Sequence, residues 1–191
     1  MMHGIKDFPF FYENKLLFYK VLSFLSISLL LLFSACQQKT DIDWMEFEKV
    51  DKIFKKNQKK GLVFIYDSSC EDCLHAKEYV QKDPFIISYI NQHYYPMQLG
   101  VFEERTIHFN GKDWHSEMSF QGAKYNTLAK ALCQDSEAVH TPTYAFLDEQ
   151  MNLIVPIKKN LSREELKLLL TYIKEDKFKE MNIEAYKATR K

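Results

Sequence analysis

Residues 62–73 read LVFIYDSSCEDC, and this stretch is the strongest indicator of the fold. Its first five residues, 62–66, are aliphatic or aromatic, and a polar run, Asp67-Ser68-Ser69, follows them. A short apolar run without alternation that ends in turn residues is typical of a strand buried on both faces. Cys70 and Cys73 follow directly, where the apolar spacing becomes helical. The stretch therefore predicts a buried strand that leads into a helix with a Cys-x-x-Cys at its first turn.

The rest of the chain alternates between helical and extended patterns of apolar residues. The expected elements are, in chain order, a helix over 43–56 with Asp43 as its N-cap, a helix over 70–81, a helix over 85–93, a strand over 94–101, a hairpin over 107–114, a helix over 123–133, two antiparallel strands over 143–147 and 152–157, and a helix that starts at the capping box of Ser162 and Glu165. This order predicts an α/β domain over 43–176, with a central mixed sheet flanked by helices and a small hairpin insertion around 105–116. The charged C-terminal tail, 177–191, is expected to fray.

The composition of the 191 residues excludes several classes of protein. Lys plus Arg and Asp plus Glu number 26 each, so no basic excess is present to neutralise a nucleic acid. Only 5 glycines and 5 prolines occur, which excludes collagen-like and low-complexity chains. Four cysteines are too few for a disulfide-dense scaffold of this length. Nothing in the sequence indicates an obligate dimer, and we expect a monomer.

Residues 1–35 have the pattern of a secretion signal. Lysines precede residues 21–35, VLSFLSISLLLLFSA, which carry no charge and are short for a membrane span of about 20 residues. With Cys36 directly after Ser-Ala, the segment resembles a bacterial lipoprotein signal peptide, and this resemblance implies that Cys36 becomes the first residue and carries lipid. An uncleaved anchor helix and an ordinary cleaved signal are the alternatives. In each case the remainder, which starts with a tether over 36–42, is expected outside the cytoplasm, on the periplasmic side of the membrane or at the cell surface.

The cysteine pair carries the candidate chemistry. Two intervening residues bring the sulfur atoms of Cys70 and Cys73 to one side of the first helical turn, close enough for a disulfide. At the start of a helix, free N–H groups and the helix dipole favour a thiolate over a thiol by up to about 2 kcal/mol. A thiolate is the form of cysteine that attacks a disulfide. We therefore expect Cys70 to be the nucleophile and Cys73 to be the thiol that resolves the mixed disulfide.

A second motif, Thr141-Pro142-Thr143, lies directly before the predicted strand 143–147. Together with residues 62–73, it gives the chain a resemblance to the thioredoxin-like superfamily over roughly residues 44–175. The resemblance implies a thioredoxin-like fold with a cis peptide bond before Pro142, where the backbone of Thr141 would pair with a substrate strand beside the disulfide. It also implies thiol–disulfide exchange on protein disulfides, with no cofactor and with a redox-recycling partner that recharges the dithiol.

The residues around the cysteines differ from those usual in this superfamily. Ser69 stands where a Trp is common, and Phe64 stands where thioredoxin has a buried Asp that accepts a proton. Glu71 and Asp72 lie between the cysteines, and their carboxylates oppose a thiolate at Cys70. A destabilised thiolate accompanies a stable disulfide, so we expect a potential nearer to about −270 mV than to about −120 mV. This favours a reductant or exchange protein over a strong oxidant.

Two other interpretations of the cysteine pair stay open. The pair, with His75, could hold copper or zinc. Structural zinc needs four ligands, however, and the sequence offers no second Cys-x-x-Cys, so no metal site is assigned. The chain could also be a non-catalytic binding protein that keeps a structural disulfide. Cys133, in a predicted helix, is expected to be a small buried apolar residue.

Overall fold

The computed structural model describes the chain in three ranges, 39–119, 122–135 and 138–190. The predicted signal segment, 1–35, and Cys36 lie outside these ranges. Within them, no helix combines the length and the apolar character that crossing a bilayer requires.

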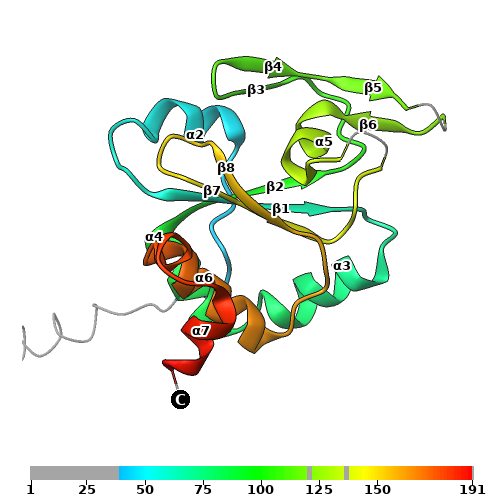
Figure 1. The fold of residues 1–191 in the computed structure, drawn as a ribbon. Coiled ribbons are helices and arrows are strands. Elements are labelled where there is room, and N and C mark those ends of the chain that lie inside the picture. The colour runs from blue at the N-terminus through cyan, green and yellow to red at the C-terminus, as the bar shows by residue number, and fades with distance from the viewer. Residues whose placement is uncertain (1–38, 120–121, 136–137, 191) are drawn as a thin grey trace, which may run out of the picture. The chain divides into compact units, whose positions relative to one another are not determined.

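The centre of the domain is a four-stranded mixed sheet in the order β2-β1-β7-β8 (Figure 1). Its strands are β1 (Lys60–Tyr66), β2 (Tyr94–Gly100), β7 (Thr143–Leu147) and β8 (Leu153–Ile157). β1 runs parallel to β2 and antiparallel to β7, which in turn pairs antiparallel with β8. The expected mixed sheet is therefore confirmed. β1 begins two residues earlier than expected and includes Gly61, where a Cβ would come within 3.0 Å of the Leu147 side chain on the neighbouring strand.

Helices cover both faces of this sheet, and successive side chains of a strand point to opposite faces. Figure 1 shows α2 (Phe47–Ile53) and α5 (Thr127–Cys133) on one face, and α3 (Glu71–His75), α4 (Pro84–His93) and α6 (Arg163–Lys174) on the other. Leu62 and Phe64 pack into the core under α3, α4 and α6, whereas Val63 and Ile65 pack into the core under α2 and α5. The two cores explain why this strand shows no polar alternation.

The first helix starts later than the sequence predicts. We expected it over 43–56 with Asp43 as its N-cap, but α2 begins at Phe47 and Glu46 precedes it without a side-chain cap. The backbone N–H of Asp43 donates to Asn91 Oδ1 at 2.8 Å, and the N–H of Met45 donates to the carbonyl of Pro96 at 2.8 Å. These two bonds to distant partners hold the segment before α2 in a non-helical conformation.

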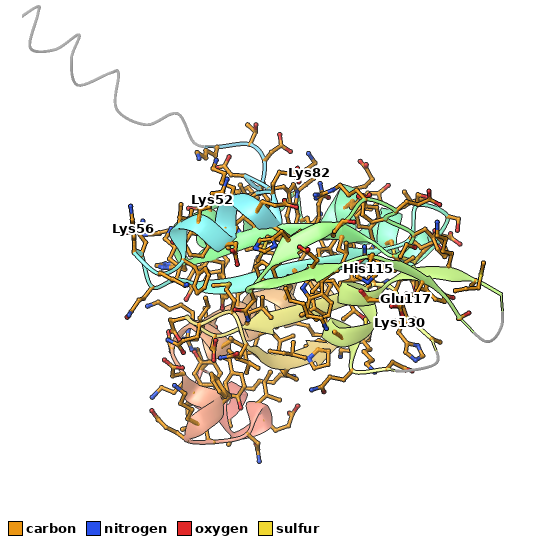
Figure 2. The ribbon with its side chains drawn as sticks, turned by 90° about the horizontal axis from the view of Figure 1, so that it is seen from above. Lys52, Lys56, Lys82, His115, Glu117 and Lys130 are labelled. Atoms are coloured by element: carbon orange, nitrogen blue, oxygen red, sulfur yellow. A yellow bond between two sulfur atoms is a disulfide. The ribbon has the colours of Figure 1, made fainter. Side chains whose placement is uncertain are left out.

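The insertion is larger than the hairpin expected around 105–116. β3 (Ile107–Phe109) and β4 (Lys112–Trp114) form the predicted hairpin, with Asn110 and Gly111 at positive φ in its turn. A second hairpin pairs β5 (Ser116–Met118) with β6 (Lys124–Asn126). The helix expected over 123–133 therefore begins only at Thr127, because residues 124–126 pair with β5. Figure 2 shows this insertion, marked by His115 and Glu117, beside α5, marked by Lys130.

In the described residues 177–190 the C-terminal tail folds against the domain, which corrects the expectation that it frays. After α6, whose capping box of Ser162 and Glu165 is confirmed, the chain forms a 3-10 turn (Lys177–Lys179) and α7 (Ile183–Ala188). Tyr186 is 3% exposed and donates its hydroxyl to a Glu175 carboxylate oxygen at 2.8 Å. A few apolar side chains thus hold this segment against the domain, although its many charged residues predict exposure to solvent.

Candidate functional site

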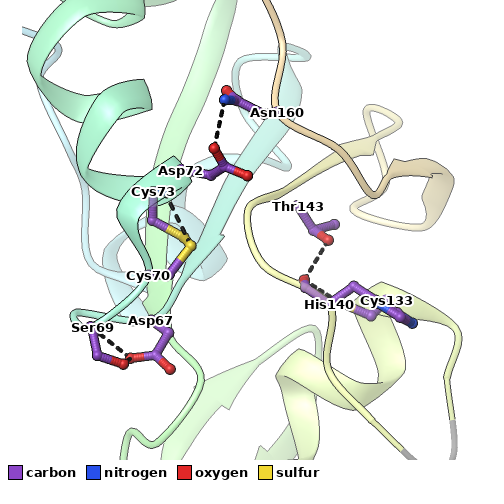
Figure 3. Close-up of a disulfide and its surroundings, with 9 residues drawn as sticks. All are labelled: Asp67, Ser69, Cys70, Asp72, Cys73, Cys133, His140, Thr143 and Asn160. Atoms are coloured by element: carbon purple, nitrogen blue, oxygen red, sulfur yellow. Dashed lines mark hydrogen bonds between the residues drawn. A yellow bond between two sulfur atoms is a disulfide. The ribbon is translucent and has the colours of Figure 1, made fainter.

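Cys70 and Cys73 form a disulfide at the carboxyl end of β1 (Figure 3). Cys70 is the N-cap of α3, with an extended backbone, and its sulfur accepts a hydrogen bond from the Cys73 N–H at 3.1 Å. The helix expected over 70–81 continues as a π-helical turn, Ala76–Val80, an irregularity that is frequent at functional sites. The sequence thus placed the pair correctly, at the start of a helix that follows a buried strand.

The two sulfur atoms differ in their access to solvent. The Cys73 side chain is 1% exposed and packs into the core on the buried side of α3, whereas Cys70 is only partly buried and packs at the edge of that core. An incoming thiol or disulfide therefore reaches Cys70 first. This difference in exposure fits the role of an attacking cysteine for Cys70 and of a resolving cysteine for Cys73.

Thr141 and Pro142 lie at the same edge of the sheet as the disulfide. The peptide bond between them is cis, and β7 begins at the next residue, Thr143, which pairs with Ile65 of β1. The Thr143 hydroxyl donates to the His140 carbonyl at 2.6 Å, which holds the turn before β7 (Figure 3). Because β1 ends where the antiparallel β7 begins, the fold brings Pro142 to the side of the cysteine loop.

Polar side chains next to the cysteines make local contacts. Asp67 Oδ1 accepts hydrogen bonds from the N–H and the hydroxyl of Ser69, at 2.8 and 2.9 Å, and so fixes the turn before Cys70. Asp72 accepts a hydrogen bond at 3.0 Å from Nδ2 of Asn160, which lies in the loop that precedes α6 (Figure 3). Glu71 is exposed. Sequence reasoning missed Asn160, because nothing local to residue 160 indicates a contact with residue 72.

A partly buried lysine lies one turn after Cys73. The Lys77 ammonium is 3.1 Å from the centroid of the Tyr66 ring, a cation–π contact at the end of β1. Burial lowers the pKa of Lys77. Tyr66 stacks in turn on Phe64, so an apolar ring fills the position where thioredoxin has its buried Asp. No local pattern indicates this contact, since a lysine on a short helix is usually solvated.

The remaining candidate residues do not join the disulfide. His75 is exposed and its ring lies tilted against that of Tyr79, with ring centroids 5.1 Å apart. Cys133 is buried, as expected, and burial raises the pKa of its thiol. In the described part of the chain, no three side chains of His, Cys, Asp or Glu are grouped as metal ligands would be.

Comparisons with known proteins agree with this architecture. Residues 47–174 match the thioredoxin-like domain family. One similar solved structure is a thioredoxin-fold protein from Helicobacter pylori, 17% identical, with a TM-score of 0.52 over 68% of this chain and 83% of that one. Another is described as DsbH oxidoreductase, 9% identical, with a TM-score of 0.50 over 72% of this chain and 88% of that one. A search of curated protein sequences finds no match. The family match spans more than half of the chain, and the sheet order, the two-sided helix cover and the Cys70–Cys73 disulfide accord with it: the chain belongs to the family of thioredoxin-like domains.

Proposed function

We propose that this protein is a thiol–disulfide oxidoreductase that acts on protein disulfides. The observation that carries the proposal is the asymmetric pair, a partly exposed Cys70 bonded to a buried Cys73, at the sheet edge where Pro142 also lies. The similarity of fold to the structure described as DsbH oxidoreductase agrees with this chemistry. A binding scaffold would need neither the bonded pair nor its asymmetric exposure.

The exchange has two steps that balance in atoms and electrons. The Cys70 thiolate attacks one sulfur of a substrate disulfide, so that a mixed disulfide forms and one substrate thiolate leaves. The Cys73 thiol loses its proton to solvent and attacks the Cys70 sulfur, so that the Cys70–Cys73 disulfide forms and the second substrate thiolate leaves. The substrate has then gained two electrons, and a partner dithiol must return two electrons to this protein. Thr141 would pair with the backbone of the substrate strand.

We further propose that lipid on Cys36 anchors the domain at the outer side of a bacterial membrane. The support is the charge-free run of residues 21–35 that ends in Ser-Ala-Cys. The wild-type protein should be labelled by fatty acid, and replacement of Cys36 by Ala should abolish that labelling. A wild-type protein that takes up no fatty acid would overturn the lipid anchor and point to an uncleaved anchor helix or an ordinary cleaved signal instead.

A glutathione redox titration tests the proposed chemistry. The full chain is equilibrated at a series of potentials and alkylated, and the peptide with Cys70 and Cys73 is weighed, which separates this pair from Cys36 and Cys133. We expect a reversible two-electron transition near about −270 mV. A transition about 100 mV higher would make the protein an oxidant and overturn the proposed direction. A pair that never titrates would overturn the exchange activity and favour a structural disulfide.

A further inference from the structure

An aromatic pair lies beside the carboxyl end of β2, where Phe102 is exposed and Tyr125 packs against the core under α2 and α5. Phe102 is 49% exposed and stacks on Tyr125 of β6, with ring centroids 5.4 Å apart and planes at 20°. The exposed area of Phe102 and the Tyr125 ring stacked on it together offer an apolar surface to a partner.

Buried hydrogen bonds hold this pair in place. Asn126 is fully buried, and its N–H donates to the Val101 carbonyl at 2.9 Å. Its side-chain Nδ2 donates to the Glu103 carbonyl at 3.1 Å, while its Oδ1 accepts from the Leu128 N–H at 3.0 Å. One side chain therefore ties the start of α5 to the segment just after β2. These bonds fix the backbone on both sides of Phe102 and directly after Tyr125, which lowers the entropy that a contact with the pair costs.

The strand order places this pair at the same end of the sheet as the disulfide. The Val101 N–H donates to the Tyr66 carbonyl at 2.9 Å, so the β1–β2 ladder extends to the residue directly before Phe102. Adjacent strands lie about 4.8 Å apart. At this edge β1 leads to Cys70, and β7, on the other side of β1, starts after Pro142. Cys70 thus follows the central strand, with Pro142 on the β7 side and Phe102 on the β2 side.

The residues between Tyr66 and Cys70 offer no apolar surface of their own. Ser68 and Ser69 are exposed and polar, and Asp67 is engaged with Ser69. Leu74, one residue after Cys73, is 49% exposed on α3. An extended substrate that places its disulfide at Cys70 therefore meets apolar surface at Leu74 on the helix side and at the aromatic pair on the β2 side.

We propose that Phe102 and Tyr125 receive an apolar side chain of the substrate, next to the substrate cysteine that Cys70 attacks. This inference rests on the proposed function and makes it more specific. The preferred substrates are extended segments in which a large apolar residue flanks the cysteine, as in proteins that are unfolded or incompletely folded.

Two peptides test this preference. They share one sequence with a single cysteine, activated as a mixed disulfide with thionitrobenzoate, and they differ only in a Phe or a Ser beside that cysteine. The reduced full chain with Cys73→Ser attacks each peptide, and the released thionitrobenzoate gives the rate. The rate of a chain with both Cys70→Ser and Cys73→Ser is subtracted, which removes any contribution of Cys36 and Cys133.

We expect the Phe peptide to react about tenfold faster than the Ser peptide. Adding Phe102→Ser should bring this ratio close to one, whereas Phe102→Leu should keep part of the preference. Phe85→Ser is the matched control, because Phe85 is 45% exposed and stacks on Tyr89 in the same manner, with centroids 5.2 Å apart, but belongs to α4. It should leave the ratio as it is.

The outcomes separate the two proposals. Equal rates for the two peptides, or a preference that survives Phe102→Ser, overturn the aromatic contact while leaving the exchange activity in place. If neither peptide reacts faster than with the doubly substituted chain, the proposed function itself is wrong. Circular dichroism of each variant confirms that a lost preference does not come from a lost fold.

Discussion

Three cysteines of the described chain lie in three different environments. Cys70 is partly exposed at the start of α3, Cys73 is buried beneath it, and Cys133 is buried in the opposite core with its thiol 3.9 Å from the His140 carbonyl. Reactivity of a cysteine follows its access to solvent and the stability of its thiolate. Exposure alone therefore ranks Cys70 as the reactive one.

The Cys133 thiol should be inert in the folded protein. Burial raises its pKa, so at pH 8 it carries less thiolate than an exposed thiol does. After reduction, iodoacetamide should alkylate Cys70 faster than Cys133 by about a hundredfold or more, as peptide mass spectrometry measures. Guanidinium should remove the difference. Equal labelling in the native state would contradict the burial of Cys133.

The carboxylates between the cysteines should lower the reduction potential. Glu71→Gln or Asp72→Asn removes a negative charge beside the Cys70 thiolate, which stabilises the reduced form. Each change should raise the potential by about 10 mV, because an exposed charge contributes a fraction of 1 kcal/mol and 30 mV corresponds to about 1.4 kcal/mol. Glu78→Gln, an exposed carboxylate further along the same helical segment, is the control and should leave the potential unchanged. A lower potential in either motif variant would refute this account.

At the scale of elements, helix starts follow their caps. Asp83, Asn126 and Ser162 each accept hydrogen bonds from backbone N–H groups at the start of α4, α5 and α6. Where the cap is one of these short polar residues in a clear pattern, as at Asp83 and Ser162, the sequence predicts the start to within a residue. α2 has no side-chain cap, and its start was predicted wrongly.

The capping box of α6 should make a measurable, pH-dependent contribution to stability. Hydrogen bonds from the Lys159 ammonium and from the Ser162 N–H and hydroxyl lower the pKa of Glu165 from 4.5 to about 2. A folded-state pKa below the unfolded value stabilises the fold above about pH 4.5, and that stabilisation is lost as pH falls toward 2. Ser162→Ala should cost about 1 kcal/mol at pH 7 in urea unfolding.

The stability lost through Ser162→Ala should become smaller as the pH is lowered. Between pH 5 and 2 the difference between wild type and Ser162→Ala should shrink, because protonation of Glu165 weakens the same hydrogen bonds in the wild type. Glu165→Gln keeps an acceptor oxygen but cannot titrate, so its unfolding free energy should vary less over this range. A Ser162→Ala difference that stays constant down to pH 2 would exclude the linkage.

At the scale of the whole molecule, the C-terminal segment completes the core beneath α6. Tyr172 and Tyr186 pack with ring centroids 5.3 Å apart, and the Tyr172 hydroxyl donates to the Met181 carbonyl at 2.5 Å. The family match ends at residue 174, before this segment. The 3-10 turn and α7 therefore lie outside the matched region, and Tyr186 of α7 packs in the apolar interior of the domain.

Removal of the Tyr186 ring should destabilise the entire domain. Tyr186→Ala should lower the free energy of unfolding by about 2–3 kcal/mol, since it removes a buried aromatic side chain and leaves a cavity. Tyr79→Ala is the matched control, because Tyr79 is 58% exposed, and it should cost less than about 0.5 kcal/mol. Urea unfolding measures both. Equal small losses would mean that α7 does not dock on the domain in solution.

The features that could be predicted from the sequence alone are those that local interactions create. These are the apolar strand over 62–66, the cysteine pair at the start of a helix, the Asn110-Gly111 turn and the capping box of α6. Each depends on residues a few positions apart, through side-chain periodicity, turn conformation or a cap, and a single sequence contains that information. The position of Thr141-Pro142 before a strand belongs to the same class.

Which distant segments meet depends on long-range packing, and the sequence alone does not contain it. Hydrogen bonds from backbone N–H groups to Asn91 Oδ1 and to the Pro96 carbonyl delay the start of α2, and residues 124–126 pair with β5 where a helix was expected. Long-range packing also brings Asn160 to Asp72 and Phe102 to the edge of the sheet where Cys70 lies. The physical reason is the same in each case: the partner that fixes the conformation lies far away in the sequence, and only the strand order and the packing of the helices bring it into contact.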